Sequence, residues 1–148
     1  MVCLGNICRS PIAEGVMKQK IVANKLDWEV DSAGTESYHV GEAPHRFSQK
    51  ICLSHGIDIS GQRARKFIVA DFDRFDKIYA MAEDVYQEIK SIGGKQAQMD
   101  KVTLFLNELI EDSSDDVPDP YYGGEEGFTL VYDLLNETCD AIVNKYKH

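Results

Sequence analysis

The chain has 148 residues, of which 43% are hydrophobic and 28% charged, so it has room for one globular domain spanning residues 1–148. Its 16 Lys and Arg against 25 Asp and Glu give a formal net charge of −9, which argues against sequence-independent binding of nucleic acid and against docking on an anionic membrane. No apolar run reaches the roughly 20 residues that span a bilayer. We therefore expect a cytoplasmic monomer whose partners are small molecules or local features of proteins.

The spacing of the cysteines and histidines argues against disulfides and metal sites. The residues concerned are Cys3, Cys8, Cys52 and Cys139 together with His39, His45, His55 and His148. The cysteines form neither CxxC pairs nor the pattern of a secreted scaffold, which predicts free thiols in a reducing compartment. The histidines lack metal-ligand spacing. We therefore expect no metal and no cofactor.

In the first half of the chain, helical periods alternate with short apolar runs. The apolar positions after Pro11 predict a first helix that reaches about Leu26. A strand is expected over Trp28–Ser32 and is stopped by Gly34. A second helix is expected over about Arg46–His55, with Gly56 as its stop. This alternation is typical of an α/β fold.

The second half continues the alternation. The expected elements are a short acidic and aromatic segment at Asp71–Phe75, a buried strand at Ile78–Met81, a helix at about Val85–Ile92 ended by Gly93, a strand at Val102–Leu106 and a helix at about Phe128–Tyr146. The order implies a three-layer α/β/α fold around a central parallel sheet of four strands. Because only Met1 and Val2 precede Cys3, we expect the first of these strands to be truncated.

The first eleven residues, MVCLGNICRSP, combine a strand end, a tight polar loop and a helix start. Backbone N–H groups of such a loop and of the first helical turn can surround one tetrahedral anion. Gly5 permits close approach of the backbone, and Asn6 tolerates the left-handed conformation that such loops require. Arg9 can grip two oxygens of the anion with its planar fork. The segment therefore predicts a phosphate loop between the first strand and the first helix.

The same positive field would stabilise a thiolate at Cys3, which would then be a nucleophile beneath a bound phosphate. Ser10 could donate a hydrogen bond to the departing sulfur. An alternative remains open on the spacing alone, because a cysteine and an arginine five residues apart also occur by chance. In that interpretation Cys3 is a small buried apolar residue, Cys8 packs inside, and Arg9 is a solvated charge at the helix start.

Longer blocks of the sequence resemble the low-molecular-weight protein tyrosine phosphatases. Val2–Pro11 closely resembles the phosphate loop of this family. Matching blocks follow in the family's order over nearly the whole chain, at Val30–Thr35, Tyr38–Gly41, His55–Arg65, Phe75–Met81 and Asp119–Gly123. The resemblance implies hydrolysis of phosphotyrosine or small aryl phosphates through a phosphocysteine intermediate.

Carried over residue by residue, the resemblance implies that Cys3 is the nucleophile, Arg9 the phosphate clamp and Asp119 the general acid. The residues implied to bind phosphate or support the loop are Leu4, Gly5, Asn6, Ile7, Cys8, Ser10 and Ser32. Tyr38, Tyr121 and Tyr122 are implied to form the walls for an aromatic substrate. Cys8 is implied to form a disulfide with the nucleophile under oxidation. Read without the family, Asp119 before Pro120 would only begin a turn, and Cys8 would only pack.

Two further positions depart from the family pattern. Gln62 stands where many members carry a histidine that supports the phosphate loop, and Ala82 stands where an aspartate often braces the acid loop. Related activities remain as alternatives. Arsenate reductases on this loop need further cysteines, and 82–98 contains none; protein-arginine phosphatases tend to carry Thr where this chain has Ile7. A catalytically weak phosphate-binding module is the alternative outside the enzymes.

Overall fold

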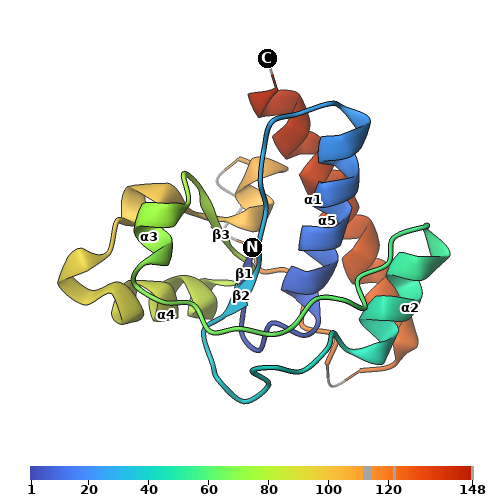
Figure 1. The fold of residues 1–148 in the computed structure, drawn as a ribbon, viewed down its shortest axis with the longest axis horizontal. Helices are drawn as coiled ribbons and strands as arrows, with labels where there is room; N and C mark the ends of the chain where they lie inside the picture. The colour runs from blue at the N-terminus through green and yellow to red at the C-terminus, as the bar shows by residue number, and fades with distance from the viewer. Residues whose placement is uncertain (112–114, 122, 148) are drawn as a thin grey trace.

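A computed structural model describes residues 1–111, 115–121 and 123–147. Four strands form one sheet: β1 (Val2–Cys3), β2 (Ala33–Gly34), β3 (Ile78–Ala80) and β4 (Val102–Leu104). All neighbours pair in parallel, in the order β2-β1-β3-β4 (Figure 1). The predicted four-stranded parallel sheet is confirmed. The first strand, β1, contributes Val2 and Cys3 to the ladder.

The helices follow the predicted order with small shifts at their ends. They are α1 (Arg9–Ala23), α2 (Arg46–Ser54), α3 (Asp71–Arg74), α4 (Glu83–Gly93) and α5 (Glu125–Tyr146), with 3-10 turns at Gly94–Gln96, Met99–Lys101 and Phe105–Glu108. Gly56 and Gly94, which follow α2 and α4, have φ angles of 78° and 53°, a region that residues with a Cβ avoid. In the described ranges, no helix is both long and apolar enough to cross a membrane.

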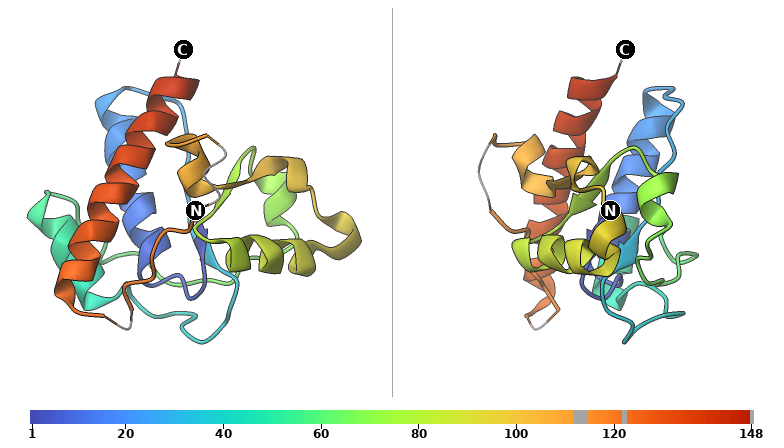
Figure 2. Two further views of the ribbon diagram at one scale, coloured as in Figure 1. Left: turned by 180° about the vertical axis from the view of Figure 1, so that it is seen from behind. Right: turned by 90° about the vertical axis from the view of Figure 1, so that its left-hand side faces the viewer.

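Helices cover both faces of the sheet because side chains alternate along each strand. Cys3, Tyr79 and Met81 point into a core formed with α1 and α5. Val2, Ile78 and Ala80 point the other way, into a second core with α3 and α4. Figures 1 and 2 show α1, α2 and α5 grouped on one side of the sheet and α3 and α4 on the other. The three-layer α/β/α architecture is therefore confirmed.

The last helix, α5, packs its apolar residues into the core. A stripe of side chains at helical spacing is buried along α5, at Phe128, Val131, Tyr132, Leu135, Cys139, Ile142 and Val143. Each fully buried side chain of this size stabilises the fold by about 1.5–3 kcal/mol relative to an exposed one. The stripe faces α1, so these two helices form one packed layer beneath Cys3.

Two predicted strands differ from the observed ones. Trp28–Ser32 is irregular, and pairing begins only at Ala33, which lies opposite Val2. β2 is an edge strand, and its neighbour in the sheet is β1. Within the described part of the chain, the residues before Ala33 therefore have no strand opposite them with which to pair. The predicted strand Val102–Leu106 stops at Leu104 because Phe105 begins a 3-10 turn.

The carboxyl ends of the central strands meet at one edge of the sheet, where the site lies. The Thr35 N–H donates to the carbonyl of Cys3, and the Val117 N–H donates to that of Met81. Gly34 is required at this edge, since a Cβ there would lie 2.8 Å from the carbonyl oxygen of Leu4. This close approach brings the loop after β1 against the end of β2.

Candidate active site

Asn6 organises the predicted phosphate loop. Its φ angle of 58° is left-handed, as expected. Its side-chain amide bonds in three directions: Nδ2 donates to Ser10 Oγ at 2.7 Å and to Ser32 Oγ at 3.0 Å, and Oδ1 accepts from the Arg65 backbone N–H at 3.0 Å. The network predicted from Asn6, Ser10 and Ser32 is present, with Arg65 as an additional member.

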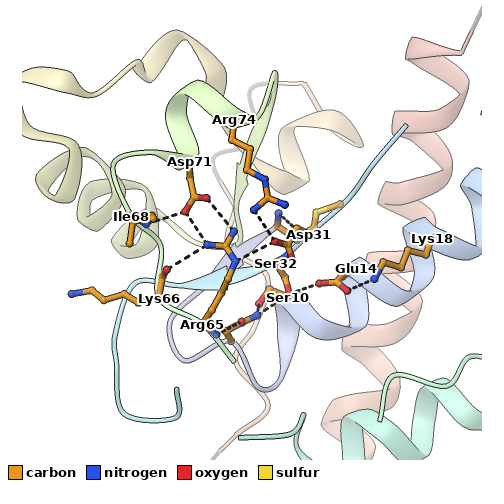
Figure 3. A network of polar contacts seen from close by, with 12 residues as sticks. Ser10, Glu14, Lys18, Asp31, Ser32, Arg65, Lys66, Ile68, Asp71 and Arg74 are labelled. Carbon is orange, nitrogen blue, oxygen red and sulfur yellow. Dashed lines mark hydrogen bonds and ion pairs between the residues drawn. The ribbon is translucent and has the colours of Figure 1, made fainter. Parts of the chain in front are cut away.

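A buried carboxylate fixes the direction of the hydrogen bonds in this network. Glu14 Oε1 accepts from Ser32 Oγ at 2.7 Å, and Glu14 Oε2 pairs with Lys18 (Figure 3). Because Ser32 donates its only hydrogen to Glu14, it accepts from Asn6. Ser10 also accepts from Asn6, which leaves its hydroxyl hydrogen free to be donated to Cys3 Sγ, 3.0 Å away. The chain of bonds therefore allows Ser10 to donate to the sulfur.

Arg9 connects the phosphate loop to a second loop. Its guanidinium is buried, with Nη1 donating to the carbonyl of Val117 at 3.1 Å and Nη2 lying 3.5 Å from Asp119 Oδ2. Arg9 is also the first residue of α1, and Cys8 before it makes no side-chain capping bond. The leading N–H groups of α1 thus have no side-chain cap, which leaves the helix N-terminus suited to an anion.

The loop that carries Asp119 is held by its neighbours on both sides. Ala82 precedes α4 without a side-chain cap, and Asp116 takes over this role by accepting from the Glu83 N–H at 2.8 Å. The brace that the sequence places in doubt at Ala82 is therefore supplied from the acid loop itself. Asp119 Oδ1 accepts from the Tyr121 N–H at 3.0 Å, so the turn expected of an Asp-Pro sequence is also formed.

These loops enclose a cavity of about 160 Å³. It is lined by Cys3, Leu4, Gly5, Ile7, Cys8 and Arg9 of the phosphate loop and by Tyr38, His39, Asp119 and Tyr121. Cys3 is 2% exposed, whereas Tyr38 and Tyr121 are 77% and 40% exposed, so the sulfur lies deep and the two aromatic rings lie at the rim. Tyr122, the third predicted wall residue, lies outside the described residues.

The remaining predicted residues lie behind the loop rather than in the cavity. Asn6, Ser10 and Ser32 are buried; Ser10 contacts Cys3 directly, and Asn6 links Ser10 to Ser32. Gln62 donates to the carbonyl of Pro11 at 3.1 Å, so it supports the first turn of α1 and not the loop itself. A larger cavity of about 520 Å³ beside Met1 contains none of the predicted catalytic residues.

His39 is a cavity residue that sequence reasoning missed. Its ring lies against Gly5, where a Cβ would come within 2.9 Å of His39 Cδ2, and its Nδ1 contacts Glu42 Oε2 at 2.6 Å. Tyr121 packs between His39 and His45, with both ring centroids 6.0 Å away. The sequence signal for His39 is its position next to Tyr38, a predicted wall residue, in the block Tyr38–Gly41. Within the described ranges, no three His, Cys, Asp or Glu side chains gather as a metal site.

The cysteines differ sharply in their surroundings. All four are free and buried. Burial raises the pKa of Cys8 to about 12, with nearby Cys3 and Asp119 adding to the shift and Arg9 opposing it. Burial also raises the pKa of Cys52 and of Cys139 to about 12. These three thiols stay protonated near neutral pH. Cys3 Sγ lies 3.0 Å from the Ser10 hydroxyl, on the floor of the cavity.

Comparisons with known proteins agree with the fold. The family described as low molecular weight phosphotyrosine protein phosphatase matches residues 1–148. The low molecular weight protein-tyrosine-phosphatase PtpA of Staphylococcus aureus is 41% identical over 145 residues, 97% of this chain and 89% of that protein. A protein tyrosine phosphatase structure from Entamoeba histolytica has a TM-score of 0.89 and 40% identity, covering 97% of this chain and 92% of that one. The Drosophila arginine phosphatase structure has a TM-score of 0.91 and 32% identity, covering 99% and 96%. The chain belongs to the low molecular weight phosphotyrosine protein phosphatase family.

Proposed function

We propose that the protein hydrolyses phosphotyrosine in proteins, and small aryl phosphates, through a phosphocysteine intermediate. The single observation that carries this proposal is the meeting of Cys3, Arg9 and Asp119 around one cavity with an aromatic rim. Family membership supports the phosphatase chemistry. The roles proposed for the individual residues are those implied by the family resemblance, and the geometry of their contacts supports them.

In the first step, the substrate phosphate lies within the loop that follows Cys3. Backbone N–H groups and the Arg9 fork hold its oxygens and stabilise the charge that builds on them. The Cys3 thiolate forms the S–P bond as the bond from phosphorus to the phenolic oxygen breaks. Asp119 gives its carboxyl proton to that oxygen, and the phenol leaves neutral. Asp119 is then a carboxylate.

In the second step, water attacks the phosphocysteine. The Asp119 carboxylate takes a proton from the water as the new O–P bond forms, and the S–P bond breaks to return the thiolate. The Ser10 hydroxyl, 3.0 Å from Cys3 Sγ, donates to the departing sulfur and so stabilises the thiolate. Inorganic phosphate leaves, and the protonated Asp119 starts the next cycle. No cofactor takes part in either step.

The depth of the cavity supports an aromatic substrate. A phosphate held by Arg9 lies near the 2% exposed Cys3, whereas Tyr38 and Tyr121 stand at the surface. A phosphorylated tyrosine ring bridges this depth and packs against the aromatic rim. A phosphoserine side chain is too short to bring its phosphate to the sulfur while its backbone stays outside.

Two related activities are the alternatives. Similarity to the Drosophila arginine phosphatase makes phosphoarginine an alternative substrate. Against it, Ile7 lines the cavity with an apolar side chain that offers no hydrogen-bond acceptor to a guanidinium. Arsenate reduction needs a relay of reactive thiols, but Cys52 and Cys139 are core residues whose pKa is raised to about 12. The free thiols also fit a cytoplasmic setting.

The test is turnover of para-nitrophenyl phosphate by the wild type and by Cys3→Ser. We expect the wild type to release phosphate and the variant to lose turnover while still binding vanadate or phosphate, because only the attacking sulfur is changed. Cys52→Ser is the matched control, a buried cysteine in α2 away from the cavity. Substantial turnover by Cys3→Ser would refute the assignment. A wild type that binds oxyanions without turnover would instead indicate a binding module.

A further inference from the structure

Arg65 lies outside the cavity, yet its backbone holds the phosphate loop. Its N–H donates to Asn6 Oδ1 at 3.0 Å, and its carbonyl accepts from the Gly34 N–H at 2.8 Å. The first bond engages the acceptor oxygen of the Asn6 amide, and it supports a left-handed residue that has a Cβ. The position of the Arg65 backbone therefore bears directly on the shape of the loop.

The Arg65 side chain in turn fixes that backbone. Nη1 and Nη2 bind the two carboxylate oxygens of Asp71 at 3.0 and 3.2 Å, and Nε lies 3.2 Å from Asp31 Oδ2. Asp71 is buried and also accepts from the Ile68 N–H at 2.9 Å, so it is a fixed anchor at the start of α3. Figure 3 shows the guanidinium between the two carboxylates.

The second anchor, Asp31, leads to the same loop from another side. It immediately precedes Ser32, whose Oγ accepts from Asn6 Nδ2 at 3.0 Å. One guanidinium thus ties together both chain segments that hold Asn6 from outside its own loop. Burial lowers the pKa of Arg65, but hydrogen bonds and charge from Asp71 and Asp31 outweigh it and raise the pKa above its ordinary value, so the fork stays charged.

We propose that Arg65 is a positioning residue for catalysis: by bridging Asp71 and Asp31 it holds Asn6, and through Asn6 it keeps the Ser10 hydroxyl on Cys3. This inference rests on the proposed function of Cys3. It assigns to Arg65 a role in the reaction without contact to substrate. A lysine would keep the charge but could not bind both carboxylates with a planar fork.

The experiment compares Arg65→Lys with Arg74→Lys. Arg74 is the matched control because it also pairs with Asp31, at 3.7 Å, but its side chain is 62% exposed. We expect Arg65→Lys to lower kcat for para-nitrophenyl phosphate by about tenfold and to slow alkylation of Cys3 by iodoacetate to a similar degree, as contacting networks couple at this scale. Arg74→Lys should stay within about twofold of the wild type, as exposed ion pairs contribute little.

A double-mutant cycle with Asn6→Ala separates positioning from a general structural role. If Arg65 acts through Asn6, Arg65→Lys should have almost no further effect on kcat in the Asn6→Ala background, although it should lower the melting temperature in both backgrounds. Independent, multiplicative effects of the two changes on kcat would overturn the inference. Wild-type kcat in Arg65→Lys would overturn it as well.

The two proposals fail in different ways. If wild-type protein does not hydrolyse aryl phosphates, or Cys3→Ser does, the proposed function fails whatever Arg65 does. If wild type and Cys3→Ser behave as proposed but the cycle shows no coupling, only the role of Arg65 fails. All assays are made where circular dichroism shows folded protein. Should Arg65→Lys not fold, Asp71→Asn, which weakens the fork from its partner's side, replaces it in the same cycle.

Discussion

Arg9 donates a hydrogen bond to the carbonyl of Val117, 108 residues further along the chain, at 3.1 Å. The same guanidinium lies 3.5 Å from Asp119. The group proposed to grip the phosphate therefore also orients the loop that carries the proposed acid. A single side chain thus connects the loop after β1 with the loop that follows β4 and its 3-10 turn.

The first prediction concerns this shared guanidinium. Arg9→Lys should lower kcat/KM for aryl phosphates by at least about a hundredfold, since an ammonium cannot form the bidentate contact with phosphate and cannot also reach Val117. Steady-state kinetics and vanadate titration measure the loss. Arg46→Lys, on an arginine that lies over the ring of Phe47, serves as the control and should change little. Near wild-type kinetics for Arg9→Lys would show that the phosphate is held elsewhere.

The second prediction isolates the acid. Asp119→Asn should slow hydrolysis strongly for aryl phosphates whose phenols are weak acids, and much less for those with acidic phenols, which leave without protonation. The measurement is kcat across a series of substituted phenyl phosphates, giving a steeper dependence on leaving-group acidity in the variant. The same slowdown for every member of the series would remove Asp119 from this role.

The third prediction concerns the brace between the acid loop and α4. Asp116→Ala removes the acceptor for the Glu83 N–H, so it should lower the free energy of unfolding by about 1 kcal/mol, the usual effect of losing a cap. It should also reduce kcat by loosening the loop that carries Asp119. Adding Ala82→Asp gives α4 a cap of its own and should restore stability more fully than kcat, because it does not re-anchor the loop. Urea unfolding and kinetics of both variants test this; unchanged stability in Asp116→Ala would contradict it.

The fourth prediction concerns oxidation of the two loop cysteines. Peroxide would convert the Cys3 thiolate to a sulfenic acid, and condensation with the Cys8 thiol would give a disulfide and release water. We therefore expect wild-type activity lost to peroxide to return with dithiothreitol, and activity of Cys8→Ser to be lost irreversibly. Cys52→Ser, the control, should recover like the wild type. Mass spectrometry of the oxidised protein should find the Cys3–Cys8 pair; full recovery of Cys8→Ser would exclude a protective role.

Much of the fold could be predicted because its signals are local. The α5 stripe, the glycine after α2 and the buried run Ile78–Met81 each carry their own periodicity or stop residue. The strand at Trp28–Ser32 could not be judged this way, because a strand exists only where a partner lies in register. The local sequence pattern does not predict which segments pair in the sheet.

The candidate site, like the fold, has parts that the local sequence predicts and parts that it does not. The loop from Cys3 to Arg9 is contiguous, so its spacing and its chemistry can be read together. Arg65 is 59 residues from the Asn6 side chain that it holds, and Asp116 caps a helix 33 residues earlier. Such contacts depend on how segments pack, and a charged residue in a sequence gives no sign of which segment it will meet.

The last prediction concerns substrate choice, and it depends on the rim. If Tyr38 and Tyr121 pack against the substrate ring above the buried Cys3, phosphotyrosine peptides should be hydrolysed at least about a hundredfold more efficiently than phosphoserine peptides, which corresponds to roughly 3 kcal/mol. Replacing Tyr38 by Ala should raise KM for phosphotyrosine peptides and narrow this ratio, whereas Tyr86→Ala on α4, away from the cavity, should leave it unchanged. The same protein preparation is also assayed for hydrolysis of phosphoarginine and for thioredoxin-coupled reduction of arsenate. Preference for phosphoarginine, despite the apolar Ile7 in the cavity, or turnover of arsenate would overturn the tyrosine assignment while leaving the phosphate-loop chemistry in place.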